Sequence, residues 1–142
     1  MPVKVCLGGT FNVIHEGHLA LLSRAFQEGD EVFVGLTSDR MAQKGRTGKV
    51  NDYPSRLIGL IDALENLADG KEFQVFKIDD EFGPAASSDF DVIVVSRETA
   101  PTAERINKAR LDSGLRPLRI EAIDIVLGQD GKKVSASRLI DD

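Results

Sequence analysis

The chain has 142 residues and a formal net charge of -5, with 42% hydrophobic and 29% charged residues. This length suits one domain with a sizeable core, and the negative charge argues against a general nucleic-acid binder. No apolar run is long enough to span a membrane, and no basic start followed by an apolar stretch predicts a signal peptide. The single cysteine, Cys6, cannot form an internal disulfide, so we expect a cytoplasmic protein.

The chain begins with a predicted strand–helix–strand unit. The apolar run at 3–9 predicts a strand buried on both faces, and helical spacing over 17–28 predicts the first helix. The apolar side of this helix is formed by Leu19, Leu22 and Phe26. Gly29 ends the helix, and 31–37 is the second predicted strand.

A polar stretch at 38–52 separates the second strand from the next long helix. Its glycines predict a mobile loop with at most one short helical turn. Pro54 suits the first turn of the helix that follows, and Gly70 ends it. The apolar stripe of this helix consists of Leu57, Ile61, Leu64 and either Leu67 or Ala68. The third strand is predicted at 73–79.

The second half of the chain continues the same alternation. A fourth strand is predicted at 91–96, and a helix runs from Thr99 to just before Gly114. The fifth strand is predicted at 118–127, and residues 135–142 open a final helix.

Strands that alternate with helices in this way form a parallel sheet with helices on both faces. The sequence therefore predicts a single doubly wound, Rossmann-like α/β domain over 1–142 with a five-stranded parallel sheet. In such a sheet, ligands bind beyond the carboxyl ends of the strands, usually beside the first strand.

The segment GGTFNVIHEGH, residues 8–18, occupies that place in the predicted fold. It holds both histidines of the chain, His15 and His18, three positions apart. Paired glycines let a ligand approach the backbone, Thr10 offers a hydroxyl, and Gly17 opens a helix whose N–H groups attract phosphate. The segment predicts a phosphate-binding site.

Two other interpretations of the histidine pair are weaker. A zinc site needs three or four ligands, the chain has no third histidine, and Cys6 lies within a strand, where a small buried side chain is expected. Chance packing of two histidines in a core does not account for the glycines beside them. The segment also lacks the G-x-G-x-x-G dinucleotide motif and the G-x-x-x-x-G-K-[ST] triphosphatase loop. We therefore predict imidazoles that donate hydrogen bonds to phosphate oxygens, and no metal held by the protein.

The histidine segment at 8–18 resembles the signature of a known family. HEGH at 15–18 matches the HxGH signature of the nucleotidyltransferase superfamily, and GGTF at 8–11 strengthens the match. Further stretches in the right order resemble the archaeal and eukaryotic type of phosphopantetheine adenylyltransferase: GLTSDRMAQK (35–44), KIDDEFGPA (77–85), VVSRET (94–99) and VLGQDGKKVSASRL (126–139). The resemblance implies an enzyme that transfers AMP from ATP to 4'-phosphopantetheine, giving dephospho-coenzyme A and pyrophosphate.

The resemblance also implies roles for single residues. His18 would stabilise charge at the α-phosphate, His15 would hold the triphosphate, and Lys44 would complete the catalytic set by bridging the phosphates of both substrates. Arg46 could replace Lys44 if the register slips by two positions. Thr10 would hydrogen-bond the attacking phosphate, although a hydroxyl at a strand end can instead cap the turn.

The implied binding residues come from four segments. Those for ATP are Gly8, Gly9, Thr10, Phe11, His15, His18, Ser96, Arg97, Thr99, Ser135, Ser137 and Arg138, and those for the acceptor are Thr10 and Lys44. The serines of VSASRL could instead form an ordinary N-cap. Mg²⁺ would be held mainly by the ATP phosphates. Asp39 and the pair Asp79–Asp80 are candidates for magnesium or substrate contacts, although acidic residues after a strand are more often caps or turn formers.

Several residues depart from the family pattern. Asn12 stands where aspartate is usual, and Ala136, Ser137 and Ile140 alter the ISSTxxR signature that VSASRL resembles. Two rival functions follow. One is another HxGH nucleotidyltransferase, with FMN or nicotinamide mononucleotide as acceptor or with a cytidylyl donor, and the other is a non-catalytic nucleotide-binding module.

Overall fold

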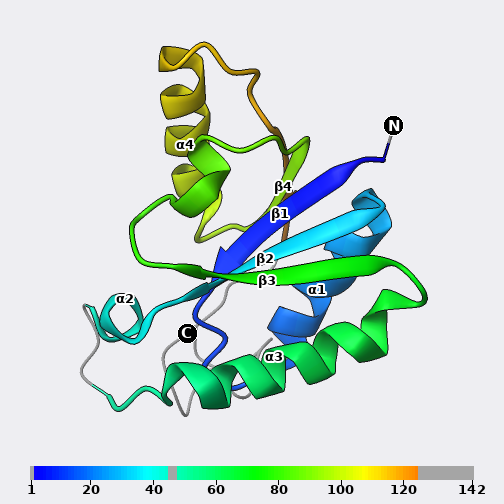
Figure 1. Cartoon of the computed structure of the whole chain (residues 1–142), viewed down its shortest axis with the longest axis vertical. Helices are drawn as coiled ribbons and strands as arrows, with labels where there is room; N and C mark the ends of the chain where they lie inside the picture. Colours follow the sequence, from blue (N-terminus) through cyan, green and yellow to red (C-terminus); the bar gives the residue numbers. More distant parts are fainter. Residues whose placement is uncertain (1, 45–47, 125–142) are drawn as a thin grey trace.

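The computed structural model describes residues 2–44 and 48–124. Its elements in chain order are β1 (Lys4–Gly9), α1 (Glu16–Glu28), β2 (Glu31–Thr37), α2 (Asp39–Gln43), α3 (Tyr53–Ala68), β3 (Glu72–Ile78), the 3-10 helix η1 (Gly83–Ala86), β4 (Val92–Ser96), α4 (Ala100–Asp112) and β5 (Arg119–Ile123). The strands form one parallel sheet in the order β3-β2-β1-β4-β5 (Figure 1). The predicted doubly wound α/β class is confirmed.

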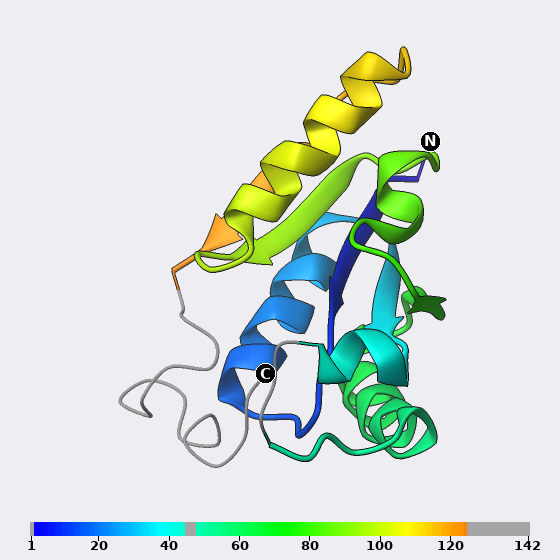
Figure 2. The ribbon, with the colours of Figure 1, turned by 90° about the vertical axis from the view of Figure 1, so that its left-hand side faces the viewer.

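Helices cover both faces of the sheet. α1 and α3 pack together on one face, and α4 with η1 packs on the other (Figures 1 and 2). The short helix α2 confirms the single helical turn expected after the second strand. β5 confirms the predicted fifth strand over Arg119–Ile123, and Asp124 lies just beyond its end. The rest of the predicted strand, 125–127, and the final helix at 135–142 lie outside the described residues. No helix in the described ranges is both long and apolar enough to cross a membrane.

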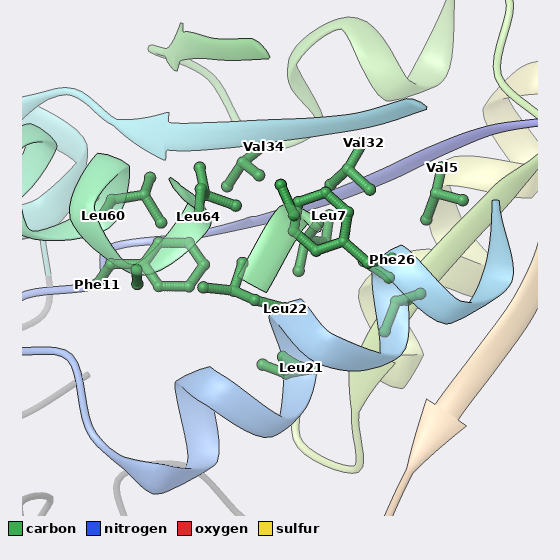
Figure 3. Close-up of a cluster of buried hydrophobic side chains, with 14 of the residues drawn as sticks. Val5, Leu7, Phe11, Leu21, Leu22, Phe26, Val32, Val34, Leu60 and Leu64 are labelled. Atoms are coloured by element: carbon green, nitrogen blue, oxygen red, sulfur yellow. The ribbon is translucent and has the colours of Figure 1, made fainter. Parts of the chain in front are cut away.

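The larger of two apolar cores lies between the sheet and the helices α1 and α3 (Figure 3). On α1 the prediction was partly wrong. Leu22 and Phe26 are buried as expected, but Leu19 is 38% exposed. The buried stripe runs instead through His18, Leu22, Ala25 and Phe26. Leu22 lies four positions after His18, and Ala25 and Phe26 lie three and four positions after Leu22, so these residues share one face of the helix. The first position of this apolar stripe is therefore a histidine.

The stripe of α3 also differs from the prediction. Leu64 and Ala68 are buried as expected, but Leu60 is completely buried in addition, while Ile61 is only partly buried. The helix packs against β2 and β3 and also against α1, so its buried face is wider and turned relative to a stripe drawn from spacing alone. One turn before Leu60, the same face carries Arg56, which is also buried.

The sheet carries a glycine pair where β1 and β2 lie side by side. Gly8 and Gly35 are register partners, and Phe76 of β3 is the next partner in the row. A Cβ at Gly35 would overlap Cδ1 of Ile78 and lie 2.6 Å from its Cγ1 and 2.9 Å from Cε2 of Phe76. The missing side chain at Gly35 leaves the room that the Ile78 side chain occupies on this face of the sheet.

We expect Gly35→Ala to lower the free energy of unfolding by about 1–3 kcal/mol, because the added methyl group must displace Ile78 or Phe76 in a close-packed region. The measurement is urea denaturation at neutral pH. Gly59→Ala is the matched control, since a Cβ there meets only Ile14 at 3.9 Å within an exposed helix position. It should raise stability by about 0.5–1 kcal/mol. Equal effects of the two variants would contradict the packing argument.

Candidate active site

The order of the strands places the candidate site. β1 lies between β2 and β4, and the chain moves outward from β1 in both directions. The segments that follow β1, β2 and β4 therefore meet at the carboxyl edge of the sheet, where doubly wound folds bind their ligands. The histidine segment predicted from the sequence lies at this edge, between the end of β1 and the start of α1.

The two histidines form a reciprocal pair of hydrogen bonds at the start of α1. His15 is the N-cap, and its Nδ1 accepts a hydrogen bond from the Gly17 N–H at 3.1 Å. His18 Nδ1 accepts one from the His15 N–H at 3.2 Å. This is a capping box in which imidazoles replace the usual hydroxyl and carboxyl groups. The rings stack with centroids 3.8 Å apart, and Phe11 packs against His18 at 5.0 Å.

These contacts define the chemical state of both rings. Because each Nδ1 accepts a backbone N–H, the neutral ring carries its proton on Nε2. Burial lowers the pKa of His15. Burial, followed by the adjacent His15, lowers the pKa of His18 to about 3. At neutral pH both rings are therefore uncharged N–H donors beside the positive end of the α1 dipole, an arrangement suited to phosphate oxygens.

A buried arginine that the sequence analysis missed holds the surrounding segments together. Arg56 of α3 is 1% exposed. Its Nη1 donates to the Thr10 carbonyl at 3.1 Å and to Thr37 Oγ1 at 3.3 Å, and its Nη2 pairs with Asp39 at 3.0 Å. Its Nε donates to the Asn51 carbonyl at 2.7 Å. The signal in the sequence was a charged residue one turn before Leu60 on the apolar stripe.

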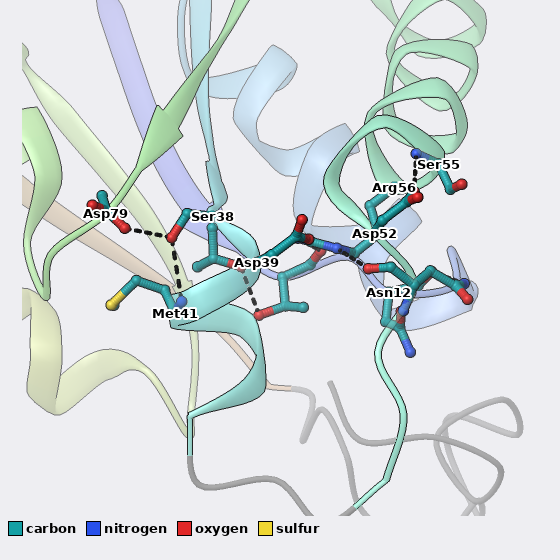
Figure 4. Close-up of polar contacts among 11 residues, drawn as sticks. Asn12, Ser38, Asp39, Met41, Asp52, Ser55, Arg56 and Asp79 are labelled. Atoms are coloured by element: carbon teal, nitrogen blue, oxygen red, sulfur yellow. Dashed lines mark hydrogen bonds and ion pairs between the residues drawn. The ribbon is translucent and has the colours of Figure 1, made fainter.

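The Asn12 departure has a structural role. Asn12 Oδ1 accepts the Asn51 N–H at 2.8 Å, and the Asn51 side chain donates to the Asn12 carbonyl at 3.2 Å (Figure 4). These bonds tie the loop after β1 to the segment that leads into α3, where Asp52 is the N-cap. An aspartate could accept the same N–H, so an amide at position 12 keeps this anchor with one negative charge fewer.

The acidic candidates are engaged by neighbouring side chains and turns. Asp39 pairs with Arg56, and Asp79 accepts from the Ser38 hydroxyl at 2.6 Å (Figure 4). Asp80 accepts from the Gly83 N–H at 2.5 Å. Bonding to Ser38, with Arg40 nearby, lowers the pKa of Asp79. The structure uses these residues as turn formers and ion-pair partners. Among the residues described, no group of three or more His, Cys, Asp or Glu is placed to hold a metal ion.

The predicted residues after β4 form a tight turn. The buried Ser96 donates its backbone N–H to Thr99 Oγ1 at 3.0 Å. Arg97 is exposed and pairs with Asp124 at 3.1 Å. Lys44 lies exposed at the end of α2. Arg46, Ser135, Ser137 and Arg138, together with the departures at Ala136 and Ile140, lie outside the described residues.

An apolar cavity of about 190 Å³ adjoins the glycines of the phosphate segment. Gly8 and Gly9 contribute one side, Ile78 and Phe82 another, and Ala103 of α4 a third. Cys6 also lines it, and its side chain is buried, as predicted. Burial raises the pKa of the Cys6 thiol to about 12. The edge thus combines donors for phosphate with an adjoining apolar space.

Known proteins are similar to this chain over most of its length. A family model described as cytidylyltransferase-like matches residues 6–142. A phosphopantetheine adenylyltransferase of Methanosarcina acetivorans is 39% identical over 98% of this chain and 89% of that protein. One of Pyrococcus furiosus is 41% identical over 94% of this chain and 84% of that protein. A crystal structure of a protein with unknown function from Archaeoglobus fulgidus has a TM-score of 0.78 and 36% identity, and the match covers 86% of this chain and 90% of that one.

The parallel sheet, its strand order and the histidine segment define a nucleotidyltransferase domain. The chain belongs to the cytidylyltransferase-like family and, within it, to the archaeal-type phosphopantetheine adenylyltransferases. The resemblance found in the sequence is confirmed.

The lowered pKa of His18 makes stability depend on pH. Protonation of His18 is disfavoured in the folded state. Its contribution to stability is therefore fully present above about pH 6.5, the pKa of histidine in the unfolded chain, and is lost as the pH falls toward its folded-state pKa of about 3. We expect His18 to contribute a loss of about 2 kcal/mol in the free energy of unfolding between pH 7 and pH 5. Urea denaturation at both pH values measures it, with His18→Gln as the control whose stability falls less.

The ring state is checked directly by nitrogen NMR of the two imidazoles. We expect both rings to be neutral with the proton on Nε2 at pH 7, and the His18 signals to stay unchanged through pH 5. A His18 titration near pH 6.5, or a proton on Nδ1, would contradict this description.

Proposed function

We propose that this protein transfers the adenylyl group of ATP to 4'-phosphopantetheine, giving dephospho-coenzyme A and pyrophosphate. The observation that carries the proposal is the His15–His18 capping box at the carboxyl edge, in the segment whose first glycines, Gly8 and Gly9, line an apolar cavity. The full-length similarity to proteins named phosphopantetheine adenylyltransferase supports the same activity.

The reaction is a displacement at phosphorus. An oxygen of the acceptor phosphate attacks the α-phosphorus of ATP, a new P–O bond forms, and the bond from the α-phosphorus to the oxygen bridging to the β-phosphate breaks. Pyrophosphate leaves with that oxygen, so no covalent enzyme intermediate is required. The protein must then bring two polyanions together and stabilise charge that builds up in the transition state.

The histidines suit this task. His18 Nε2–H is proposed to donate to the α-phosphate, and His15 Nε2–H to the triphosphate, next to the amino end of α1. As uncharged donors they need no proton exchange with solvent during the reaction. Lys44, exposed after α2, is proposed to supply the positive charge between the two substrates, since its long side chain can reach across the edge.

The remaining proposed contacts surround this centre. The glycine backbone before Thr10 and the backbone of Phe11 border the phosphates, while the Phe11 ring is buried in the core behind them. The Ser96–Thr99 turn with Arg97 borders the nucleoside. Ser135, Ser137 and Arg138 complete the proposed ATP site on the strength of the sequence resemblance. The apolar cavity beside Gly8 and Ile78 suits the pantetheine arm, which is long, uncharged and partly apolar.

A Mg²⁺ ion fits the proposed site only as a companion of ATP. Asp39 and Asp79, two of the acidic candidates, already pair with Arg56 and with Ser38 and Arg40, respectively. Magnesium retains several waters and is commonly held by substrate phosphates, where it neutralises their charge.

The acceptor and the donor nucleotide are tested together by pyrophosphate release. With ATP we expect turnover with 4'-phosphopantetheine and none with FMN or nicotinamide mononucleotide. Release with CTP and a phosphorylated alcohol alone would favour a cytidylyltransferase. Tight ATP binding without pyrophosphate release in the presence of any acceptor would favour a non-catalytic nucleotide-binding module.

The role of the rings is separated from helix capping by two conservative variants. Asn is a strong N-cap and Gln suits the third position of a capping box, so His15→Asn and His18→Gln preserve the start of α1. We expect His18→Gln to lower kcat about a hundredfold, since one preorganised donor to the transition state is misplaced. His15→Asn should raise the KM for ATP. The controls are thermal unfolding and circular dichroism, which should change little at pH 7.

A kcat within twofold of the wild type for His18→Gln, with ATP and 4'-phosphopantetheine both saturating, would contradict the proposed role of His18. A loss of helix content in either variant would instead attribute the kinetic change to the helix cap.

A further inference from the structure

The buried guanidinium of Arg56 lies at the start of a directed chain of hydrogen bonds. Arg56 Nη1 donates to Thr37 Oγ1 at 3.3 Å, and the Thr37 hydroxyl donates to Thr10 Oγ1 at 3.0 Å. Arg56 has no side-chain exposure, and Thr10 is buried as well. The chain therefore runs from a permanently charged donor on α3, through the end of β2, to the loop after β1.

The direction of this chain follows from its two hydrogen bonds and the protons that they use. An arginine side chain has only donors, so Thr37 must accept from it. A hydroxyl carries a single proton, and that of Thr37 is used toward Thr10. Thr10 Oγ1 is consequently an acceptor in this contact, and its own proton is left to point to another acceptor. The nearby cation polarises both hydroxyls in the same sense.

We propose that Arg56 is a positioning residue that, through Thr37, sets the Thr10 hydroxyl as a hydrogen-bond donor to the phosphate of the acceptor. This inference rests on the proposed function, because it concerns the phosphate that attacks ATP. It gives roles to two residues, Arg56 and Thr37, to which the sequence analysis assigned none.

A purely structural role for Arg56 accounts for its other contacts. The bonds to the Thr10 carbonyl, the Asn51 carbonyl and Asp39 hold three segments at the carboxyl edge. None of them fixes the direction of the Thr10 hydroxyl, since they reach backbone oxygens and a separate carboxylate. The bond to Thr37 is the contact that distinguishes the two roles, and it can be changed without removing the buried cation.

The test therefore varies Thr37 and leaves Arg56 in place. Thr37→Val keeps the shape of the side chain and removes the hydroxyl, whereas Thr37→Ser keeps the hydroxyl and is the matched control. Without the Thr37 donor, the Thr10 proton can turn toward other partners. We expect kcat/KM for 4'-phosphopantetheine to fall about fivefold in Thr37→Val, with the KM for ATP unchanged. Thr37→Ser should restore at least half of the wild-type value.

A double-mutant cycle with Thr10→Val supplies the readout that a structural role would not move. If Thr37 acts through Thr10, adding Thr37→Val to Thr10→Val should produce no further loss of kcat/KM for the acceptor. Additive losses, an unchanged kcat/KM in Thr37→Val, or an equal rise in the KM for ATP would each overturn the proposal. Thermal unfolding of all variants identifies a change that arises from lost stability alone.

A binding measurement keeps the test independent of turnover. Calorimetry with inorganic phosphate should show weaker binding in Thr37→Val than in the wild type and Thr37→Ser. If the wild type releases no pyrophosphate with 4'-phosphopantetheine, the proposed function fails, and the phosphate affinities still decide whether Thr37 controls the Thr10 donor. Equal affinities in the three proteins would overturn the inference.

Discussion

The capping box of His15 and His18 is the interaction on which the site depends. The first backbone N–H groups of a helix have no partner within the helix, and here imidazole Nδ1 atoms satisfy two N–H groups around this start. The same bonds orient the rings, fix their tautomer and place them at the positive end of α1. Burial then keeps them uncharged. The bonds that cap the start of α1 therefore also orient the two imidazoles that the proposed phosphate site uses.

Packing around the glycines gives the site its second component. Gly8 and Gly35 leave space on the face of the sheet that is covered by α4, and the Ile78 side chain enters that space. The adjoining cavity lies next to the phosphate segment because the glycines belong to the same strand ends. An anionic group and an apolar arm on one molecule can thus be held side by side, as a phosphorylated pantetheine requires.

A charged group deep in the α3 packing connects these parts. Arg56 is costly to bury, and it is accommodated because its donors reach two backbone carbonyls, a hydroxyl and a carboxylate. Its partners come from the loop after β1, the end of β2, the start of α2 and the segment before α3. The four segments are held in one arrangement by a single side chain, which gives the site a rigid base.

The sequence alone determined the order and type of the elements, since the periods of apolar residues report helices and strands locally. It also predicted a phosphate site at the histidine segment, because HxGH, paired glycines and a helix start are adjacent in the chain. The tertiary structure decided which helix faces are buried, so Leu19 proved exposed and Leu60 central. It also decided the partners of Arg56, which lie up to 46 positions away and leave no local pattern. The spacing of apolar residues indicates which faces of a segment could be buried, whereas contacts with segments distant in the sequence decide which face is buried.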